Sequence, residues 1–441
     1  MSLTVVLLWT LAIALAVMML AQGLTLKIDL FSVRNIYLTG FIIYQLISPA
    51  SALQGTRFFD FQIDDIERAG RWLLLYSAIF LLIFLYSYHR LRFADWFAAK
   101  LSRGPAVASD SMLTGLALAV TVAALCLRLV AYQVPFLAPP AFWSAIALSS
   151  TACAIVGWIW AARRLNPAVI LLTLFIIGGS LFITLSGIYS RRPMISVLAG
   201  FVWGAYHRWA TNHSPKQLVY TAAPLLVAVT LIVAAFTAIR GHHTGETSAQ
   251  EAIGHMRNAD LGRGTSDLLG GQSVGTSVLW VLDSFPQKHS YKPLFSLRYM
   301  FYYWIPRAIW EDKPEPFSKE VATLAKLSNV RRDVLTLPPG VIGYAGAEGG
   351  FYAVIIYALF FGQFIRFFDS MVRFNPANPY IILPVGCTTG QFLGLARGDI
   401  ATFTTLAIVG FVSTYLIIYL TALVFGQTRA TTLTRHVPQL H

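Results

Sequence analysis

Long runs of apolar residues alternate with short polar segments along almost the whole chain. A transmembrane helix needs about 20 mainly apolar residues to cross the hydrocarbon core of a bilayer. Several runs come close to this length. We predict a membrane-spanning helix in each of 3–24, 35–54, 72–88, 112–132, 141–162, 168–186, 193–209, 218–239, 341–365, 379–396 and 401–425. The pattern therefore predicts an all-α integral membrane protein with about 11 transmembrane helices.

One polar segment, from about 240 to 340, is far longer than the others. We call it the insertion, and it separates a first group of predicted helices (1–239) from a second group with a short tail (341–441). Scattered apolar residues over 266–285 predict a helix lying on the membrane surface. Dense aromatic residues over 291–310 argue against disorder. Because long loops in compact proteins are commonly functional, we expect the functional site here.

Lys and Arg residues in the short loops predict how the helices are oriented. Cytoplasmic loops of membrane proteins carry an excess of these residues. One set of alternate loops holds fourteen of them, and the opposite set of short loops holds six. This distribution predicts a cytoplasmic carboxyl terminus, with the amino terminus and the insertion outside. We expect a multi-pass protein of the bacterial inner (plasma) membrane with a periplasmic insertion.

Composition agrees with a membrane protein and excludes several functions. The chain is 12% charged, whereas soluble domains carry about 25% charged residues. The net charge of +13 lies mostly in short loops, so nucleic-acid binding is not expected. The three cysteines lie far apart in apolar runs, and the sequence has no Walker-type loop, HExxH motif or spaced Cys/His cluster. We therefore expect no disulfide, metal or other cofactor.

Arginines near the outer ends of predicted helices are the first candidates for a binding site. They are Arg128, Arg191, Arg192, Arg240 and Arg397. Ionisable groups at membrane depth are costly and commonly functional. A guanidinium group stays charged and grips phosphate oxygens through two parallel hydrogen bonds. We expect these arginines to cluster and bind a diphosphate; the alternative is snorkelling to lipid headgroups.

Other candidates lie in the insertion and at the start of the span that follows it. Arg307 and Lys313 are suited to bind anionic groups, and Trp310 to lie flat against a sugar, unless they form an interfacial aromatic belt with flanking charges. Partial desolvation would make Glu348, in a glycine-rich segment, a general base. The alternative role of Glu348 is that of an acid at a helix amino terminus.

Asp399 and two loop histidines complete the candidates. Asp399 is two residues from Arg397 and is expected to orient it. His242 and His243 are suited to act as bases, although a polar loop also places histidines by chance.

Three short segments carry a resemblance to a known family: 186–192, 305–314 and 340–350. The first joins small residues to Arg191 and Arg192, the second contains Ile305-Pro306-Arg307, and the third is glycine-rich. With the layout of spans and one large outer loop, they make the chain similar to the O-antigen and oligosaccharide repeat-unit polymerases of the Wzy type.

This resemblance implies a metal-independent glycosyltransferase with an architecture related to the GT-C enzymes. Its substrates would be undecaprenyl-diphosphate-linked oligosaccharides, with membrane lipids and a chain-length regulator as further partners. The growing glycan would pass to the incoming lipid-linked unit at the periplasmic face. Glu348 would be the base, and Arg191, Arg192 and Arg397 would hold the diphosphates, supported by Arg240 and Arg307. Aromatic residues such as Tyr303 would hold sugars.

Other functions remain open. The O-antigen ligases share the layout and carry a loop His followed by Ser, Asn or Gln, with a Gly ten residues further on. Here His213-Ser214 is predicted to be cytoplasmic, and His289-Ser290 lacks that glycine, which favours the polymerase. A transporter would show internal repeats or ionisable residues deep in its spans, and we find neither. A non-catalytic assembly protein is the fourth alternative.

Overall fold

The computed structural model is all-helical within the part of the chain that it describes, with 82% helix and no strand. It describes residues 2–25, 29–55, 60–101, 109–185, 191–210, 214–239, 262, 273–303, 305, 307, 309–327, 336–376 and 378–424.

Within these residues, eight helical segments are long and apolar enough to cross a membrane. They are Leu3–Leu24 (α1), Val33–Leu53 (α2 Val33–Phe41, the π-helix η1 Ile42–Ile47 and α3 Ser48–Leu53), Ile66–Arg90 (α4), Asp110–Gln133 (α6), Pro140–Ala162 in α7 (Ala138–Ala162), Pro167–Leu185 (α8), Phe351–Phe374 (α17) and Ile400–Thr421 in α20 (Ile400–Val424). The architecture is consistent with the predicted helical membrane protein.

Three predicted spans are not among the eight. The run 193–209 lies in α9 (Arg191–Ala210), whose ends carry arginines, and 218–239 lies in α10 (Pro215–Ile239), which includes the apolar stretch Ala223–Ala235. The run 379–396 forms two short helices, α18 (Pro379–Gly386) and α19 (Thr389–Leu395).

The predicted span over 341–365 is also two helices. The first, α16 (Gly340–Gly349), ends before Gly350, and α17 begins at Phe351. Gly350 has φ 56° and ψ −128°, a conformation that is open to glycine and strained for other residues. The hydrophobic run therefore continues through a break in the helix, and Glu348 lies before the span rather than within it.

Within its described residues, the insertion contributes three helices: α13 (Val274–Ser284), α14 (Phe295–Tyr302) and α15 (Phe317–Leu324). The predicted surface helix over 266–285 is wrong for the residues described, because α13 is buried along its whole length. It packs against α3, α4 and α16. Gly275 permits this: its backbone N–H donates to the Ser48 hydroxyl at 3.0 Å, and a Cβ there would lie 2.4 Å from the Ser48 carbonyl oxygen.

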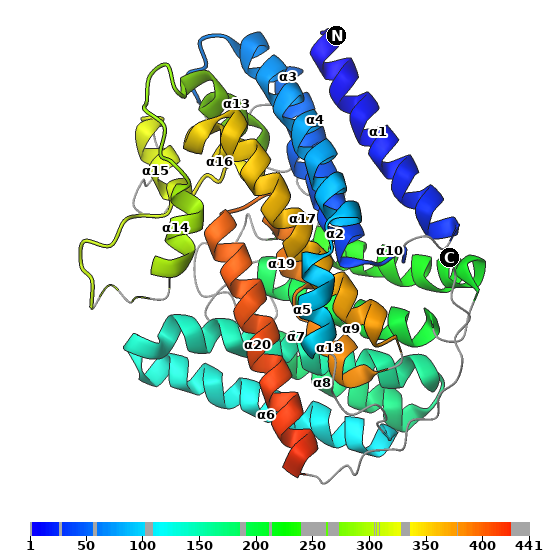
Figure 1. The fold of residues 1–441 in the computed structure, drawn as a ribbon. Coiled ribbons are helices and arrows are strands. Elements are labelled where there is room, and N and C mark those ends of the chain that lie inside the picture. Colours follow the sequence, from blue (N-terminus) through cyan, green and yellow to red (C-terminus); the bar gives the residue numbers. More distant parts are fainter. Residues whose placement is uncertain are drawn as a thin grey trace.

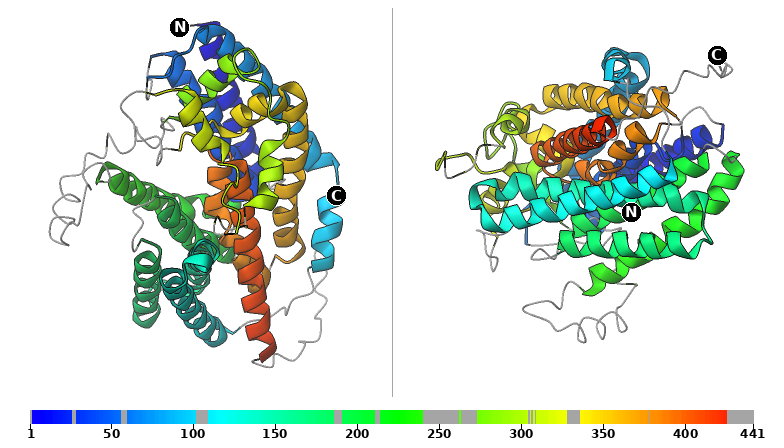
Figure 2. Two further views of the ribbon diagram at one scale, coloured as in Figure 1. Left: turned by 90° about the vertical axis from the view of Figure 1, so that its left-hand side faces the viewer. Right: turned by 90° about the horizontal axis from the view of Figure 1, so that it is seen from below.

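The helices form two groups that run in different directions (Figure 1). In the upper group, α1–α4 and α17 lie beside one another, α13 and α16 lie at their upper end, and α15 and α14 lie lower, to the left of α17. In the lower group, α6 and α7 lie side by side across α20, as the view from below also shows (Figure 2). We call the part of the upper group that holds α13–α16 and residues 60–65 the insertion end, and the part that holds residues 29–34, 88–92 and 366–376 the distal end.

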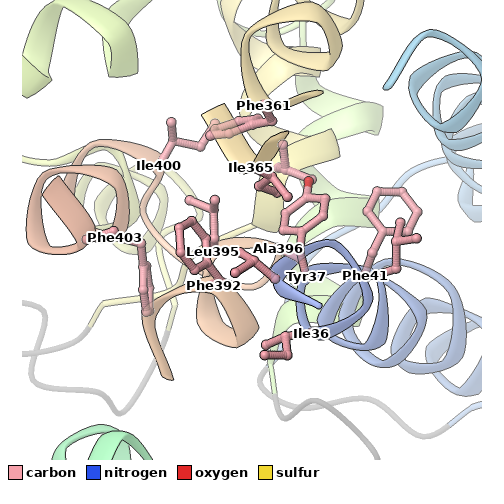
Figure 3. Close-up of a cluster of buried hydrophobic side chains, with 14 of the residues drawn as sticks. Ile36, Tyr37, Phe41, Phe361, Ile365, Phe392, Leu395, Ala396, Ile400 and Phe403 are labelled. Atoms are coloured by element: carbon pink, nitrogen blue, oxygen red, sulfur yellow. The ribbon is translucent and has the colours of Figure 1, made fainter. Parts of the chain in front are cut away.

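Buried aromatic and aliphatic side chains from distant segments join the upper group to α20. Figure 3 shows Tyr37 and Phe41 of α2 near Phe361 of α17, with residues of α19 and α20 alongside. Tyr37, Phe41 and Phe361 are completely buried. This cluster fixes the position of the segment between α19 and α20, which bears Arg397 and Asp399.

In the lower group, α7 and α9 approach very closely through small residues. Gly200 and Gly204 of α9 are four positions apart, the spacing that lets membrane helices pack tightly. A Cβ at Gly204 would lie 1.8 Å from the Ala154 carbonyl oxygen, and one at Gly157 would lie 2.3 Å from that of Phe201. Side chains larger than hydrogen therefore do not fit at this crossing.

Gly204→Val is expected to lower the free energy of unfolding by about 1–3 kcal/mol, because the side chain would meet backbone that cannot move aside. Thermal unfolding of the purified protein, followed by tryptophan fluorescence, measures this. Gly178→Val in α8 is the matched control, because a Cβ there has no neighbour within 4 Å. Equal losses in the two variants would contradict the close crossing.

Candidate functional site

Glu348 lies near the end of α16, and its side chain is buried, with 1% exposed. Oε2 accepts a hydrogen bond from the Ser296 backbone N–H at 2.9 Å, and Oε1 accepts one from the Ser296 hydroxyl at 2.5 Å. The Tyr357 hydroxyl donates a third bond to Oε2. Because Ser296 is in the first turn of α14, Glu348 satisfies an otherwise unpaired helix amide and joins α14 to α16 and α17.

The protonation of Glu348 depends on this environment. Burial raises its pKa to about 7, the hydrogen bonds from Ser296 and Tyr357 oppose the rise, and the carboxylate of Asp399 adds to it. A carboxyl group with a pKa near 7 exchanges its proton close to physiological pH, as a general base must. In this structure its hydrogen bonds with Ser296 and Tyr357 hold α14 against α16 and α17.

Asp399 connects the insertion to the last helix. Its Oδ1 accepts a hydrogen bond from the Thr402 backbone N–H at 3.1 Å and so caps α20. The Ser318 hydroxyl of α15 donates to Oδ2 at 3.5 Å. The second carboxylate of the candidate site is therefore held between α15 and α20.

Lys313 lies against the aromatic residues that precede it. Its Nζ donates to the carbonyl oxygens of Tyr303, at 2.9 Å, and Ile305, at 3.0 Å. It also lies 5.5 Å from the ring centroid of Tyr299 and 5.6 Å from that of Tyr303, within the range of cation–π attraction. Burial lowers the pKa of Lys313, and the nearby Arg307 adds to this effect.

Arg307 and Trp310 belong to the same segment. Arg307 forms an ion pair with Glu315 at 3.0 Å, and the ring of Trp310 packs edge-on against Tyr302. Burial raises the pKa of Tyr299 to about 12, and Asp399 is the next cause. Tyr299 and Ser296 both lie in α14, which packs against α16 and α20, so the aromatic segment lies between the helices that bear Glu348 and Asp399. We call Tyr299, Tyr303, Arg307, Lys313, Glu348 and Asp399 the insertion cluster.

Arg397 lies at the other end of α16 from Glu348. Its guanidinium carbon is 5.9 Å from the ring centroid of Tyr44. The carbonyl oxygen of the preceding Ala396 accepts hydrogen bonds from Gln45 Nε2 at 2.7 Å and from the Val341 backbone N–H at 3.2 Å. With a rise of about 1.5 Å per residue, Arg397 and Glu348 are separated by roughly 12 Å along the α16 axis.

The structure does not place all the predicted residues in this cluster. Arg128 lies in the α6–α7 pair, with its guanidinium carbon 4.5 Å from the ring centroids of both Tyr132 and Phe142. The side chains of Arg191 and Arg192, and all of Arg240, His242 and His243, lie outside the described residues. The predicted grouping of five arginines therefore stays a prediction.

A cavity of about 490 Å³ at the insertion end was not foreseen from the sequence. Its lining includes Asp60, Gln62, Trp280, Ser284, Lys288 and His289. Asp283, which precedes Ser284 of the lining, accepts hydrogen bonds from the Asp64 N–H at 2.9 Å and from Arg68 at 2.8 Å. The segments 60–68 and 280–289 that meet here are more than 200 positions apart, and no motif in the chain links them.

The insertion end thus contains cationic side chains, tyrosine rings and two carboxylates. It also contains a cavity lined by polar residues and by the ring of Trp280. Such a set can bind an anionic group and a polar ligand with hydroxyls. Within the described residues, no group of three His, Cys, Asp or Glu side chains could hold a metal ion. Comparison with protein-family models, with curated protein sequences and with solved structures found no match to this chain.

Proposed function

We propose that the chain is a polyprenyl-diphosphate-dependent glycosyltransferase that joins lipid-linked oligosaccharide repeat units at the insertion end. One observation carries the proposal. Residues selected from three separate sequence segments for their chemistry surround one helix, α14. Glu348 is hydrogen-bonded to Ser296 in its first turn, Lys313 lies 5.5 Å from the ring centroid of Tyr299 within it, and α20, which Asp399 caps, packs against it. Their charges suit a reaction in which a diphosphate leaves and a hydroxyl group loses a proton.

Each step of the proposed reaction has a candidate group. The bond between the anomeric carbon of the growing glycan and the diphosphate oxygen breaks, and the negative charge that develops on the lipid diphosphate needs cationic partners. Arg397, Arg307 and Lys313 are the candidates, with Arg191, Arg192, Arg240 and Arg128 as further ones. The acceptor hydroxyl oxygen of the incoming unit forms the new glycosidic bond and gives its proton to Glu348.

The buried state of Glu348 adds a condition to this mechanism. Its carboxylate is bonded to Ser296 and Tyr357, so α14 must shift before an acceptor hydroxyl can reach it. Movements of short elements over a site commonly accompany substrate binding. Trp310, Tyr303 and His242 are proposed to contact the glycan, and Asp399 to orient Arg397.

We further propose that the architecture is related to that of the GT-C enzymes. The chain would lie in a bacterial inner membrane with its insertion in the periplasm, and a chain-length regulator would be a partner.

The test is complementation of a deletion strain, with surface glycans resolved by size on a gel. Deletion is expected to collapse a ladder of chain lengths to a single capped repeat. Arg397→Ala should leave the ladder absent, with at least about 100-fold less polymer, the effect of losing one charge-stabilising donor. Arg71→Ala, an exposed arginine of α4, is the matched control and should restore the ladder.

Two other outcomes would replace this proposal. If long lipid-linked chains accumulate and none reaches the surface, the protein is an O-antigen ligase. One observation favours that second candidate: His289 lines the cavity beside Trp280, with ring centroids 6.0 Å apart. If single lipid-linked units accumulate in the cytoplasmic leaflet instead, the protein is a transporter.

A further inference from the structure

A second cavity, of about 600 Å³, lies at the distal end, away from the insertion. It is formed where the segment before α2, the end of α4, the second half of α9 and the end of α17 meet. Its lining includes Asp29, His89, Arg92, Trp203, His207 and Arg373. The volume is typical of small-ligand sites, which measure about 300–1,000 Å³.

His207 is buried in this cavity, and one of its two ring nitrogens, Nε2, has no partner among the described residues. The side chain is 5% exposed, and its Nε2 makes no hydrogen bond with any described residue. Its Nδ1 is 3.9 Å from Oδ2 of Asp29, which favours a proton on Nδ1 and leaves a lone pair on Nε2. The ring is held in place by Trp203, whose ring centroid is 4.1 Å away. A buried acceptor of this kind is costly unless a donor reaches it.

Arg92 supplies an available positive charge on the rim of the cavity. Its side chain is exposed, and within the described residues its guanidinium group forms no ion pair or hydrogen bond. Arg373, also on the rim and 60% exposed, donates to Asp95 at 3.3 Å, and its guanidinium carbon lies 5.0 Å from the ring centroid of Phe374. Both guanidinium groups are therefore placed to bind an anion.

The acidic side chains of the cavity are already engaged by the protein. Asp369 accepts hydrogen bonds from the backbone N–H groups of Val33, at 2.7 Å, and Arg34, at 3.0 Å, and from the Tyr88 hydroxyl at 2.8 Å. Asp29 accepts one from the Tyr206 hydroxyl at 2.5 Å. The groups left for a ligand are thus cationic at the rim and hydrogen-bond accepting at the depth of His207.

We propose that this distal cavity binds a phosphate-bearing ligand with a free hydroxyl group, its phosphate on Arg92 and Arg373 and its hydroxyl donating to His207 Nε2. Two sources offer this chemistry: the headgroup of a glycerol-bearing phospholipid and a soluble phosphorylated polyol. The proposal is independent of the reaction proposed for the insertion end, because the two cavities share no residue.

The experiment uses the full chain in two arms. In the first, protein in phosphatidylcholine nanodiscs is titrated with radiolabelled glycerol 3-phosphate. In the second, native mass spectrometry counts phosphatidylglycerol molecules retained by the delipidated protein, with phosphatidylcholine for comparison. Arg92→Ala should weaken binding about 10-fold or more in the arm that shows binding, as expected for a lost charge-assisted hydrogen bond. Arg90→Ala, an exposed arginine that does not line the cavity, is the matched control and should change it less than about 2-fold.

His207→Phe tests the hydroxyl contact separately, because it keeps an aromatic ring beside Trp203 and removes the acceptor. Binding of the glycerol phosphate group should weaken about 5-fold, and binding of methyl phosphate, which has no hydroxyl on carbon, should not change. Binding in the first arm alone identifies a soluble ligand, and binding in the second alone identifies a lipid. If neither probe binds, or if Arg90→Ala and Arg92→Ala weaken binding equally, the proposal is overturned.

Discussion

Replacing Glu348 by alanine is expected to lower the free energy of unfolding by about 3–5 kcal/mol and to release α14 from α16. Three donors, the Ser296 amide, the Ser296 hydroxyl and the Tyr357 hydroxyl, would lose their acceptor inside the protein. Each buried group left unsatisfied costs about 1–3 kcal/mol. Thermal unfolding of the purified protein measures the loss, and limited proteolysis within 295–327 measures the release of α14.

The glutamine variant of the same residue separates its charge from its hydrogen bonds. Glu348→Gln keeps an acceptor for Ser296 but cannot titrate. Because the pKa of Glu348 is raised from 4.5 to about 7 in the folded protein, its contribution to stability is fully present below pH 4.5 and is lost as the pH rises through 7. The corresponding free energy is about 3 kcal/mol.

The expected signature is a difference in the pH dependence of the two proteins. Between pH 4.5 and 8 the wild-type protein should lose stability, measured as the unfolding midpoint in temperature, by more than the Glu348→Gln variant does. Parallel pH profiles for the two proteins would show that Glu348 does not titrate in this range. The same profiles, measured for chain extension, would show whether proton acceptance by Glu348 limits the proposed reaction.

Replacing Arg366 by alanine is expected to destabilise the protein by about 3 kcal/mol, the lower end of the cost of breaking a buried ion pair, because Asp95 keeps Ser370 and the exposed Arg373 as partners. Arg366 of α17 donates to both carboxylate oxygens of Asp95, at 2.8 and 2.6 Å, and to the Tyr88 carbonyl oxygen. The two side chains are 9% and 13% exposed. Asp95 lies in α5 (Phe93–Leu101), so this pair holds α5 against α17.

The exposed ion pair between Lys319 and Glu315 is the control for Arg366. Its members are four residues apart and 31% and 44% exposed, so Lys319→Ala should cost only about 0.3–0.5 kcal/mol. Unfolding midpoints of the two variants, measured in the same detergent, provide the comparison. If Arg366→Ala lowers the unfolding midpoint no more than Lys319→Ala does, water reaches the ion pair between Arg366 and Asp95, and the prediction is contradicted.

Hydrophobic length predicted most of the long helices, because a run such as that in α1 or α4 has few interruptions. It could not predict the break at Gly350, where the chain changes direction without a change in hydropathy. The pattern of scattered apolar residues over 266–285 predicts a helix on the membrane surface. Gly275 instead allows the whole of α13 to pack inside the protein.

The candidate site was predictable in its parts and not in its assembly. The aromatic stretch, Lys313 and Glu348 stand out in the sequence because charge is rare in an apolar chain. The contact of Ser318 with Asp399 spans 81 positions, and no local pattern encodes it. Likewise, Arg92 and Arg373 belong to the set of charged loops that is predicted to lie on one side of the membrane. The cavity between them and His207 arises only from the folded packing of α4, α9 and α17.

The hydrogen bonds of Asp369 to the start of α2 also concern the timing of synthesis. Val33 and its acceptor Asp369 are 336 positions apart. At about 5–20 residues per second, the ribosome needs roughly 20–70 s to make the intervening chain. During that interval water must bind the backbone N–H groups of Val33 and Arg34. We therefore expect the amino terminus of the nascent α2 to stay at the water interface. The hydrogen bonds that Asp369 accepts from the start of α2 can therefore form only after α17 has been synthesised.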